Sequence, residues 1–162
     1  MAEHGQPIPR PASRVLLCDG LGRVLLFKAQ FAGRQFWITP GGGLNEGETY
    51  LEAAARELWE ETGLTLSETE ICCVWTRSHV FEFRDRLIEQ RERYFFLRVD
   101  QAPEITYDNW EEEERNDLLE HRWWSAVEIE ASPEVFAPRE LGRLLRELLR
   151  DGAPDQPYDV GV

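Results

Sequence analysis

The segment Gly41–Leu64, a glycine-rich loop followed by an acidic helix, constrains this chain more than any other part of its sequence. Consecutive glycines let backbone groups approach a ligand or a metal ion closely, because they carry no Cβ atom. Thr49 and Glu52 have the spacing of a capping box, which predicts that a helix begins there, and Gly63 suits the left-handed position that ends one. The buried stripe of this helix is predicted to contain Leu51, Ala54, Ala55 and Leu58.

Three carboxylates, those of Glu57, Glu60 and Glu61, fall at positions i, i+3 and i+4 of the same helix and therefore share one face. We expect this face to lie opposite the buried stripe. Like charges at i,i+4 spacing destabilise an isolated helix by about 0.2–0.5 kcal/mol for each pair, so the arrangement calls for a compensating partner. A hard divalent cation such as Mg²⁺, which takes oxygen ligands, would supply that compensation.

The spacing of these residues resembles the Nudix box. Every fixed position of that motif is matched in the sequence, by Gly42, Glu48, Arg56, Glu57, Leu58, Glu60, Glu61, Gly63 and Leu64. Weaker resemblances to the family lie in Trp37 and Pro40, and in the run His121–Ser125. The resemblance implies an α/β/α sandwich, with a curved mixed β-sheet between helices and the box as a loop-helix-loop. The order of the expected elements by itself favours an α+β or mixed-sheet fold over a regular βαβ alternation.

The Nudix resemblance also implies a reaction, the hydrolysis of a phosphoanhydride bond in a nucleoside diphosphate linked to another group, with Mg²⁺ or Mn²⁺. It implies Glu57, Glu60 and Glu61 as metal ligands, with the carbonyl of Gly42 as a fourth. Either Glu57 or Glu60 would also orient or deprotonate the attacking water. Arg56, four residues before Glu60, is expected to hold that carboxylate by a charge-assisted hydrogen bond. The alternative is a catalytically silent nucleotide-binding or regulatory module on the same fold.

Outside the box, Glu92 and the acidic run Glu111–Glu114 are candidates for the general base, because some Nudix enzymes place that base on a later strand or loop. Glu92 stands among aromatic and basic residues of an expected strand, whereas a run of charges is more often a solvated surface. Aromatic candidates for stacking on a nucleobase, each with core packing as the alternative, are Phe36, Trp37, Phe81 and Trp110. No substrate marker follows the box, which leaves nucleoside triphosphates, dinucleoside polyphosphates and nucleotide sugars as alternatives.

Length and charge limit the organisation of the chain and its partners. The 162 residues predict one domain, expected over 13–152, between a flexible arm at 1–12 and a tail at 153–162. The net charge of −13 argues against a nucleic-acid polymer as partner and is compatible with a small-molecule nucleotide bound through a metal ion. A monomer and a homodimer are both compatible with the sequence.

Cysteine usage and hydropathy predict a cytoplasmic protein without a membrane partner. The three cysteines include no CxxC pair and are expected to be reduced thiols. No apolar run reaches the roughly 20 residues that a membrane span needs, and the first residues lack the apolar core of a signal peptide.

Strands are expected over residues 14–18, 23–28, 36–39, 70–83 and 90–99, and from residue 122. A turn is expected over 126–133. Pro138 is expected to open a final helix with an apolar face made of Leu141, Leu144, Leu145 and Leu148.

Overall fold

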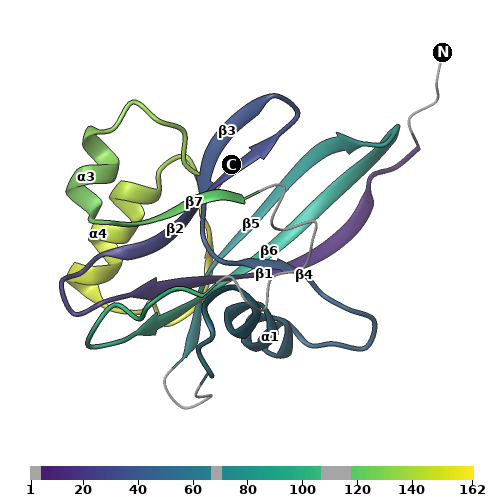
Figure 1. Ribbon diagram of the computed structural model, residues 1–162. Helices are drawn as coiled ribbons and strands as arrows, with labels where there is room; N and C mark the ends of the chain where they lie inside the picture. Colours follow the sequence, from purple (N-terminus) through teal and green to yellow (C-terminus); the bar gives the residue numbers. More distant parts are fainter. Residues whose placement is uncertain (1–4, 67–70, 107–117) are drawn as a thin grey trace.

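The computed structural model describes residues 5–66, 71–106 and 118–162 of the chain. Within these residues one mixed sheet lies between helix α1 on one face and helices α3 and α4 on the other, which is the expected α/β/α arrangement (Figure 1). In chain order the elements are β1 (Ile8–Cys18), β2 (Val24–Phe31), β3 (Arg34–Ile38), β4 (Gly41–Gly43), α1 (Tyr50–Thr62), β5 (Cys72–Phe83), β6 (Arg86–Arg98), β7 (Leu118–Trp124), α3 (Ala126–Ala131), α4 (Leu141–Asp151) and β8 (Tyr158–Asp159).

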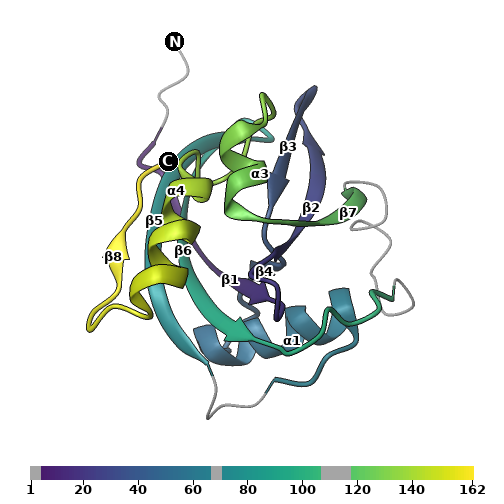
Figure 2. The same ribbon diagram turned by 90° about the vertical axis from the view of Figure 1, so that its left-hand side faces the viewer.

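Strand β1 lies at the centre of the sheet and joins its two halves. It runs parallel to β6 along its whole length, with Ile8 opposite Ile88 and Cys18 opposite Arg98. Its pairing with β2 in the described residues is confined to Cys18 and Val24, and β2 continues instead alongside β3 and β7. The two halves therefore diverge from one end of β1, and the sheet is strongly curved (Figure 2). The glycine strand β4 pairs with β1 in the region where β2 has separated from it.

Alternation along β1 and β2 divides the buried residues between two cores. On one face Val15, Leu17 and Phe27 pack with Ala54 and Leu58 of α1. The other core lies beneath α3 and α4 and contains Leu16, Leu26, Trp37, Trp75, Tyr94, Trp124, Ile129, Phe136, Leu141, Leu144, Leu145 and Leu148. The apolar face predicted for the last helix is therefore confirmed, although α4 begins at Leu141 rather than at Pro138. None of the helices in the described residues is long and apolar enough to cross a membrane.

Strand β1 begins nearer the N-terminus than the prolines of this segment suggested. The strand begins at Ile8, inside the segment expected to be a flexible arm, because Pro9 and Pro11 lie where their missing N–H groups break no ladder bond with β6. The carbonyl of Pro11 accepts from Leu44, on the side away from β6, so the backbone of these alternate residues faces that side. A proline-rich start is thus compatible with a strand.

Two other segments also differ from expectation. Residues 126–133, expected as a turn, contain helix α3, which Ser125 and Glu128 begin with a complete capping box. The same signal had correctly indicated the start of α1. The segment expected as a C-terminal tail contains β8, which pairs with β5 next to Trp75, and Val160 donates a backbone hydrogen bond to Thr76 at 3.0 Å.

Candidate active site

Helix α1 is set by local signals at both ends, as predicted. The Thr49 hydroxyl accepts from the backbone N–H of Glu52 at 3.1 Å, and the Glu52 carboxylate accepts from that of Thr49 at 3.4 Å. Gly63 adopts the left-handed conformation, with φ of 77°, and its N–H donates to the carbonyl of Trp59 at 2.8 Å. These caps fix which residues of the helix lie next to the sheet.

The carboxylates of Glu57 and Glu61 were expected to lie opposite the buried stripe of α1. They lie beside it instead. The exposed fraction is 6% for Glu57 and 3% for Glu61, and both lie on the side that packs against the glycine strand β4. The glycines make room for them, since a Cβ atom on Gly42 would lie 2.5 Å from Oε1 of Glu57. The N–H of Gly41 donates to Oε2 of Glu61 at 3.1 Å. The glycines therefore allow the carboxylates of α1 to approach the backbone of β4 closely, while their predicted approach to a ligand or a metal ion stays a prediction.

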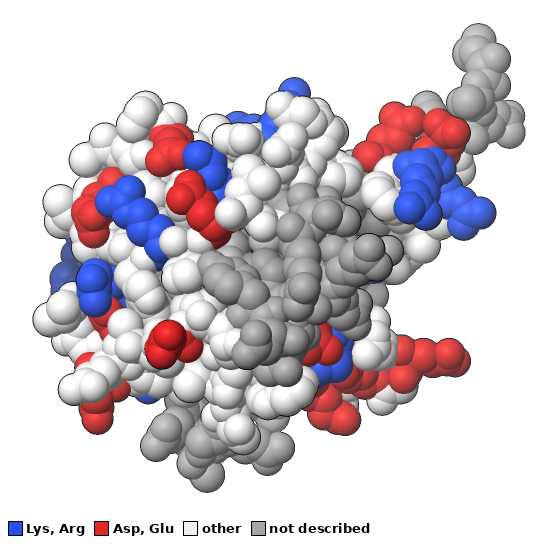
Figure 3. All heavy atoms as spheres, viewed as in Figure 1, with Lys and Arg blue, Asp and Glu red and all other residues white. Residues whose placement is uncertain are grey.

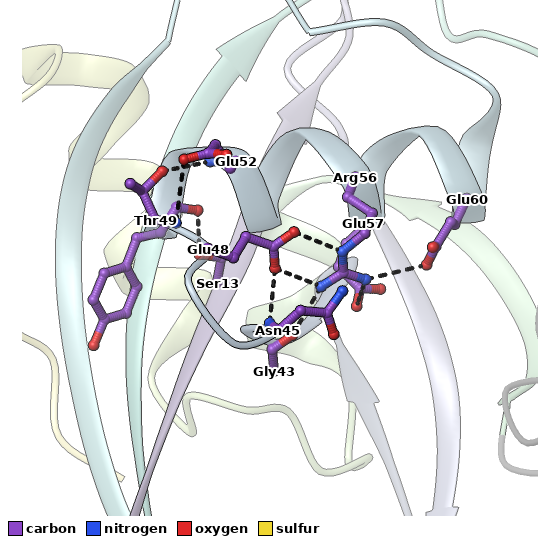
Figure 4. A network of polar contacts seen from close by, with 10 residues as sticks. Ser13, Gly43, Asn45, Glu48, Thr49, Glu52, Arg56, Glu57 and Glu60 are labelled. Carbon is purple, nitrogen blue, oxygen red and sulfur yellow. Dashed lines mark hydrogen bonds and ion pairs between the residues drawn. The ribbon is translucent and has the colours of Figure 1, made fainter.

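Arg56 links the carboxylates of Glu48, Glu57 and Glu60 into one network (Figure 4). It forms a bidentate pair with Glu48, through Nε and Nη2, at 2.9 Å for each hydrogen bond. Its Nη1 donates to Glu57 at 2.9 Å and to Glu60 at 3.4 Å, so the expected contact with Glu60 is present. Nη2 also donates to the carbonyl of Gly43 at 2.9 Å. The hydrogen bonds that Arg56 donates to Glu48 lower the pKa of Glu48, and those that it donates to Glu48 and Glu57 raise its own pKa.

These oxygen atoms have the chemistry that a hard cation requires. In the part of the chain that the structure describes, no three His, Cys, Asp or Glu side chains converge on one point as a ligand set. Glu57 and Glu60 instead accept hydrogen bonds from Arg56, and Glu61 accepts one from Gly41. Three carboxylates beside an open glycine backbone nevertheless fit Mg²⁺ or Mn²⁺, which take carboxylate and carbonyl oxygens.

The network borders a cavity of about 350 Å³. Its lining combines acidic, basic and apolar side chains from distant parts of the chain, namely Arg10, Arg14, Phe27, Ile38, Thr39, Gly41, Gly42, Gly43, Asn45, Arg56, Glu57, Glu60, Glu61 and Leu118. All four expected metal-binding residues are included. Arg10 and Arg14 were not predicted as site residues, although their spacing of four places both on one face of a strand.

Glu92, one of the candidates for the general base, is not among the residues that line the cavity and lies next to Arg14. Its exposed fraction is 3%, and it accepts hydrogen bonds from Arg14 at 2.6 Å and from Arg77 at 2.5 Å. Burial alone would raise the pKa of Glu92, but the charges of Arg14 and Arg77 outweigh burial and lower that pKa to about 2. A carboxylate with so low a pKa is a weak base.

Three of the aromatic candidates, Phe36, Trp37 and Phe81, are described by the structure and are not among the residues that line the cavity. Trp37 is buried in the core, where its ring packs edge-on against Trp124 at 5.1 Å between centroids, and Phe36 borders a smaller hollow beside Trp37. Phe81 stacks on His79, with centroids 5.4 Å apart, on β5. The fourth aromatic candidate, Trp110, lies outside the described residues, and so does the acidic run 111–114, which was a candidate for the general base.

Comparisons with known proteins agree with this geometry. A family model described as NUDIX domain matches residues 8–145. An RNA pyrophosphohydrolase of Novosphingobium aromaticivorans is 31% identical over 160 residues, which cover 88% of this chain and 92% of that protein. One of Teredinibacter turnerae is 35% identical over 98 residues, which cover 56% of this chain and 57% of that protein. The crystal structure of a MutT protein from Methanosarcina mazei shares the fold, with a TM-score of 0.61, 20% identity and coverage of 91% and 97%.

Proposed function

The chain belongs to the Nudix family, and from this premise we propose that it hydrolyses a phosphoanhydride bond in a nucleoside diphosphate linked to another group, with the help of Mg²⁺ or Mn²⁺. The observation that carries this proposal is a cavity whose lining brings the carboxylates of Glu57, Glu60 and Glu61 together with guanidinium groups, those of Arg10 and Arg14 from β1 and that of Arg56 from α1. Such a cavity can bind a polyphosphate and a divalent cation together, which neutralises the charge that develops during phosphoryl transfer.

Glu57, Glu60 and Glu61, with the carbonyl of Gly42, would hold the cation. When bound, a divalent cation lowers the pKa of a coordinated water and offsets negative charge on phosphate oxygens. Glu57 or Glu60 would orient or deprotonate the attacking water. Arg56 contacts both carboxylates and can therefore keep them in position through the reaction.

A free nucleotide is the substrate that the charge of this protein favours. The net charge is −13, and on the face shown in Figure 3 the basic side chains lie beside acidic ones. A net negative charge of this size disfavours binding along a nucleic-acid backbone, which needs basic surface. The second candidate is the 5′ end of an RNA, supported by the names of the relatives from N. aromaticivorans and T. turnerae. Both substrates present the same chemistry, a 5′-phosphoanhydride.

The test is a screen of purified protein with nucleoside triphosphates, dinucleoside polyphosphates, nucleotide sugars and an RNA oligonucleotide carrying a 5′-triphosphate. We expect release of a mononucleotide, phosphate or pyrophosphate with Mg²⁺ or Mn²⁺, and loss of this activity when a chelator removes the metal. Product identification assigns the bond that is cleaved. Absence of turnover on the whole panel would contradict the proposal and favour a catalytically silent nucleotide-binding module.

A further inference from the structure

Arg14 is fixed at the cavity by two other parts of the fold. Its Nε donates to Glu92 on β6 at 2.6 Å, and its Nη1 donates to the carbonyl of Thr39 at 3.3 Å. The ladder between β1 and β4 also places Arg14 opposite Gly41. The side chain is 13% exposed and lines the cavity. A guanidinium held in this way is a preorganised donor rather than a mobile surface charge.

Two further guanidinium groups lie near Arg14. Among the described contacts, Glu92 is the carboxylate that faces both Arg14 and Arg77. Arg10, on the same face of β1, adds a third guanidinium and donates to the neutral side chain of Gln90 at 2.5 Å. Burial and the charge of Arg14 both lower the pKa of Arg10, so the two cations affect each other. A phosphate in the cavity could accept further hydrogen bonds from Arg10 and Arg14, which both line it.

The hydroxyl of Thr39 supports the same conclusion. Thr39 lines the cavity, and its Oγ1 is buried without a hydrogen-bond partner among the residues that the structure describes. Buried polar groups in native proteins nearly always have a partner. Because Arg14 contacts the carbonyl of Thr39, this hydroxyl and the guanidinium belong to the same part of the cavity.

We infer that Arg14, with Arg10 beside it, binds phosphate oxygens of the substrate, and that Glu92 is a positioning residue that holds Arg14 in place. The inference rests on the proposed function and deepens it by naming residues that recognise the 5′-polyphosphate. An arginine fork suits this task, because it can donate two parallel hydrogen bonds to a phosphate group. A phosphate in the cavity could contact Arg10 and Arg14 while a cation held by Glu57, Glu60 and Glu61 lies in the same cavity.

The first experiment compares Arg14→Gln and Arg14→Lys with the wild type. Isothermal titration calorimetry with a non-hydrolysable nucleoside triphosphate analogue measures affinity in the presence of Mg²⁺, and steady-state kinetics separates KM from kcat. We expect Arg14→Gln to weaken affinity and raise KM by about 10- to 100-fold, the size of a lost charge-assisted hydrogen bond. Arg14→Lys keeps the charge but not the fork, and we expect an intermediate loss.

The matched control is Arg91→Gln, which removes the same charge from an exposed residue of β6 that pairs with Glu89 outside the cavity lining. We expect its affinity and KM to equal those of the wild type. Wild-type affinity in a folded Arg14→Gln variant would overturn the inference. If Arg14→Gln does not fold, wild-type affinity in Arg14→Lys would overturn it instead.

The second experiment tests how Glu92 acts, through Glu92→Gln and the double variant with Arg14→Gln. A positioning residue acts through Arg14, so Glu92→Gln should raise KM with little change in kcat and should add no further effect in the Arg14→Gln background. A general base would instead lower kcat by about 10²- to 10⁴-fold in both backgrounds. That result would overturn the role given to Glu92.

Failure of the inference and failure of the proposed function are distinguishable. Absence of turnover by the wild type contradicts the proposed function, while calorimetry still measures the part that Arg14 takes in binding the analogue. Normal turnover with unchanged affinity in Arg14→Gln contradicts the inference alone. Parallel titrations of the wild type with the free nucleotide analogue and with a 5′-triphosphate RNA of a few nucleotides show which of the two ligands it binds. Arg14→Gln should weaken the binding of that ligand.

Discussion

The two sides of the cavity are built in different ways. The acidic side comes from one continuous segment, in which β4 and α1 bring Gly41–Gly43 against Glu57 and Glu61. The basic side is assembled by β1 and β6, where Arg10 meets Gln90 across 80 residues and Arg14 meets Glu92 across 78. The first arrangement is encoded locally, whereas the second exists only once two distant strands have paired in register.

The carboxylates and the arginines of the cavity are also neutralised in different ways. On the acidic side Arg56 separates carboxylates that would otherwise repel, and it belongs to the same helix as Glu57 and Glu60. On the basic side the single carboxylate of Glu92 separates Arg14 from Arg77 and comes from a different strand than either. Changes on the acidic side should therefore affect chemistry, and changes on the basic side should affect stability as well as substrate affinity.

The largest expected effect is on the acidic side. Glu60→Gln or Glu61→Gln removes a carboxylate from the cavity and should lower kcat by about 10²- to 10⁴-fold or more, with the fold retained. Glu46→Gln is the matched control, because Glu46 is exposed in the loop before α1 and lies outside the cavity lining. Turnover is measured with the best substrate of the screen, and the fold is checked by circular dichroism. Wild-type rates in both cavity variants would show that the site is assigned wrongly.

The next effect is on the basic side and concerns stability as a function of pH. Glu92 faces Arg14, Arg77, His79 and Tyr94, and its pKa is lowered from 4.5 to about 2. Since the folded pKa lies below the unfolded one, its stabilising contribution is present above pH 4.5 and is lost as pH falls toward 2. We expect Glu92→Gln to lower the free energy of unfolding by on the order of 3 kcal/mol at pH 7.

Urea unfolding of the wild type and of Glu92→Gln, followed at several pH values between 7 and 3, checks this expectation. The difference between the two proteins should be constant above about pH 5 and should shrink below pH 4.5. If the difference in the free energy of unfolding between the two proteins does not change with pH, Glu92 contributes by packing rather than by charge. The contact of Glu92 with Arg14 and Arg77 would then not stabilise the protein electrostatically.

The smallest expected effect is that of replacing Gly41, which contacts both the acidic and the basic side of the cavity. It pairs with Arg14 on β1 and donates to Glu61 on α1. Its φ of +147° is rarely adopted by residues with a side chain, and a Cβ atom there would collide with the backbone carbonyl of Ser13. We expect Gly41→Ala to destabilise the protein by about 2 kcal/mol and to reduce turnover.

Gly47→Ala is the control for this change. Gly47 also has a positive φ, of +78°, but a Cβ atom there would meet no heavy atom within 4 Å. Only the backbone penalty of about 1 kcal/mol should therefore appear in thermal unfolding. Equal losses in the two variants would show that close packing between β4 and β1 is not what requires glycine at Gly41.

Local sequence determined the features of this protein that depend on neighbouring residues. The capping box at Thr49, the left-handed Gly63 and the contact between Arg56 and Glu60 all follow from spacings of a few residues, and the structure confirms each of them. The same kind of signal at Ser125 and Glu128 marks α3, so that helix could have been predicted too. The Nudix family could be recognised for the same reason, since its motif is one short segment.

Tertiary structure alone decided the other features, because strand pairing and burial depend on residues far apart in the chain. Pairing with β6 made the proline-rich start a strand, and it made Glu92 the buried partner of two arginines. Packing against the glycine strand placed Glu57 and Glu61 beside the buried stripe of α1 rather than opposite it. The contacts of Arg10 with Gln90 and of Arg14 with Glu92 had no local signature, since they arise only from the register of β1 on β6.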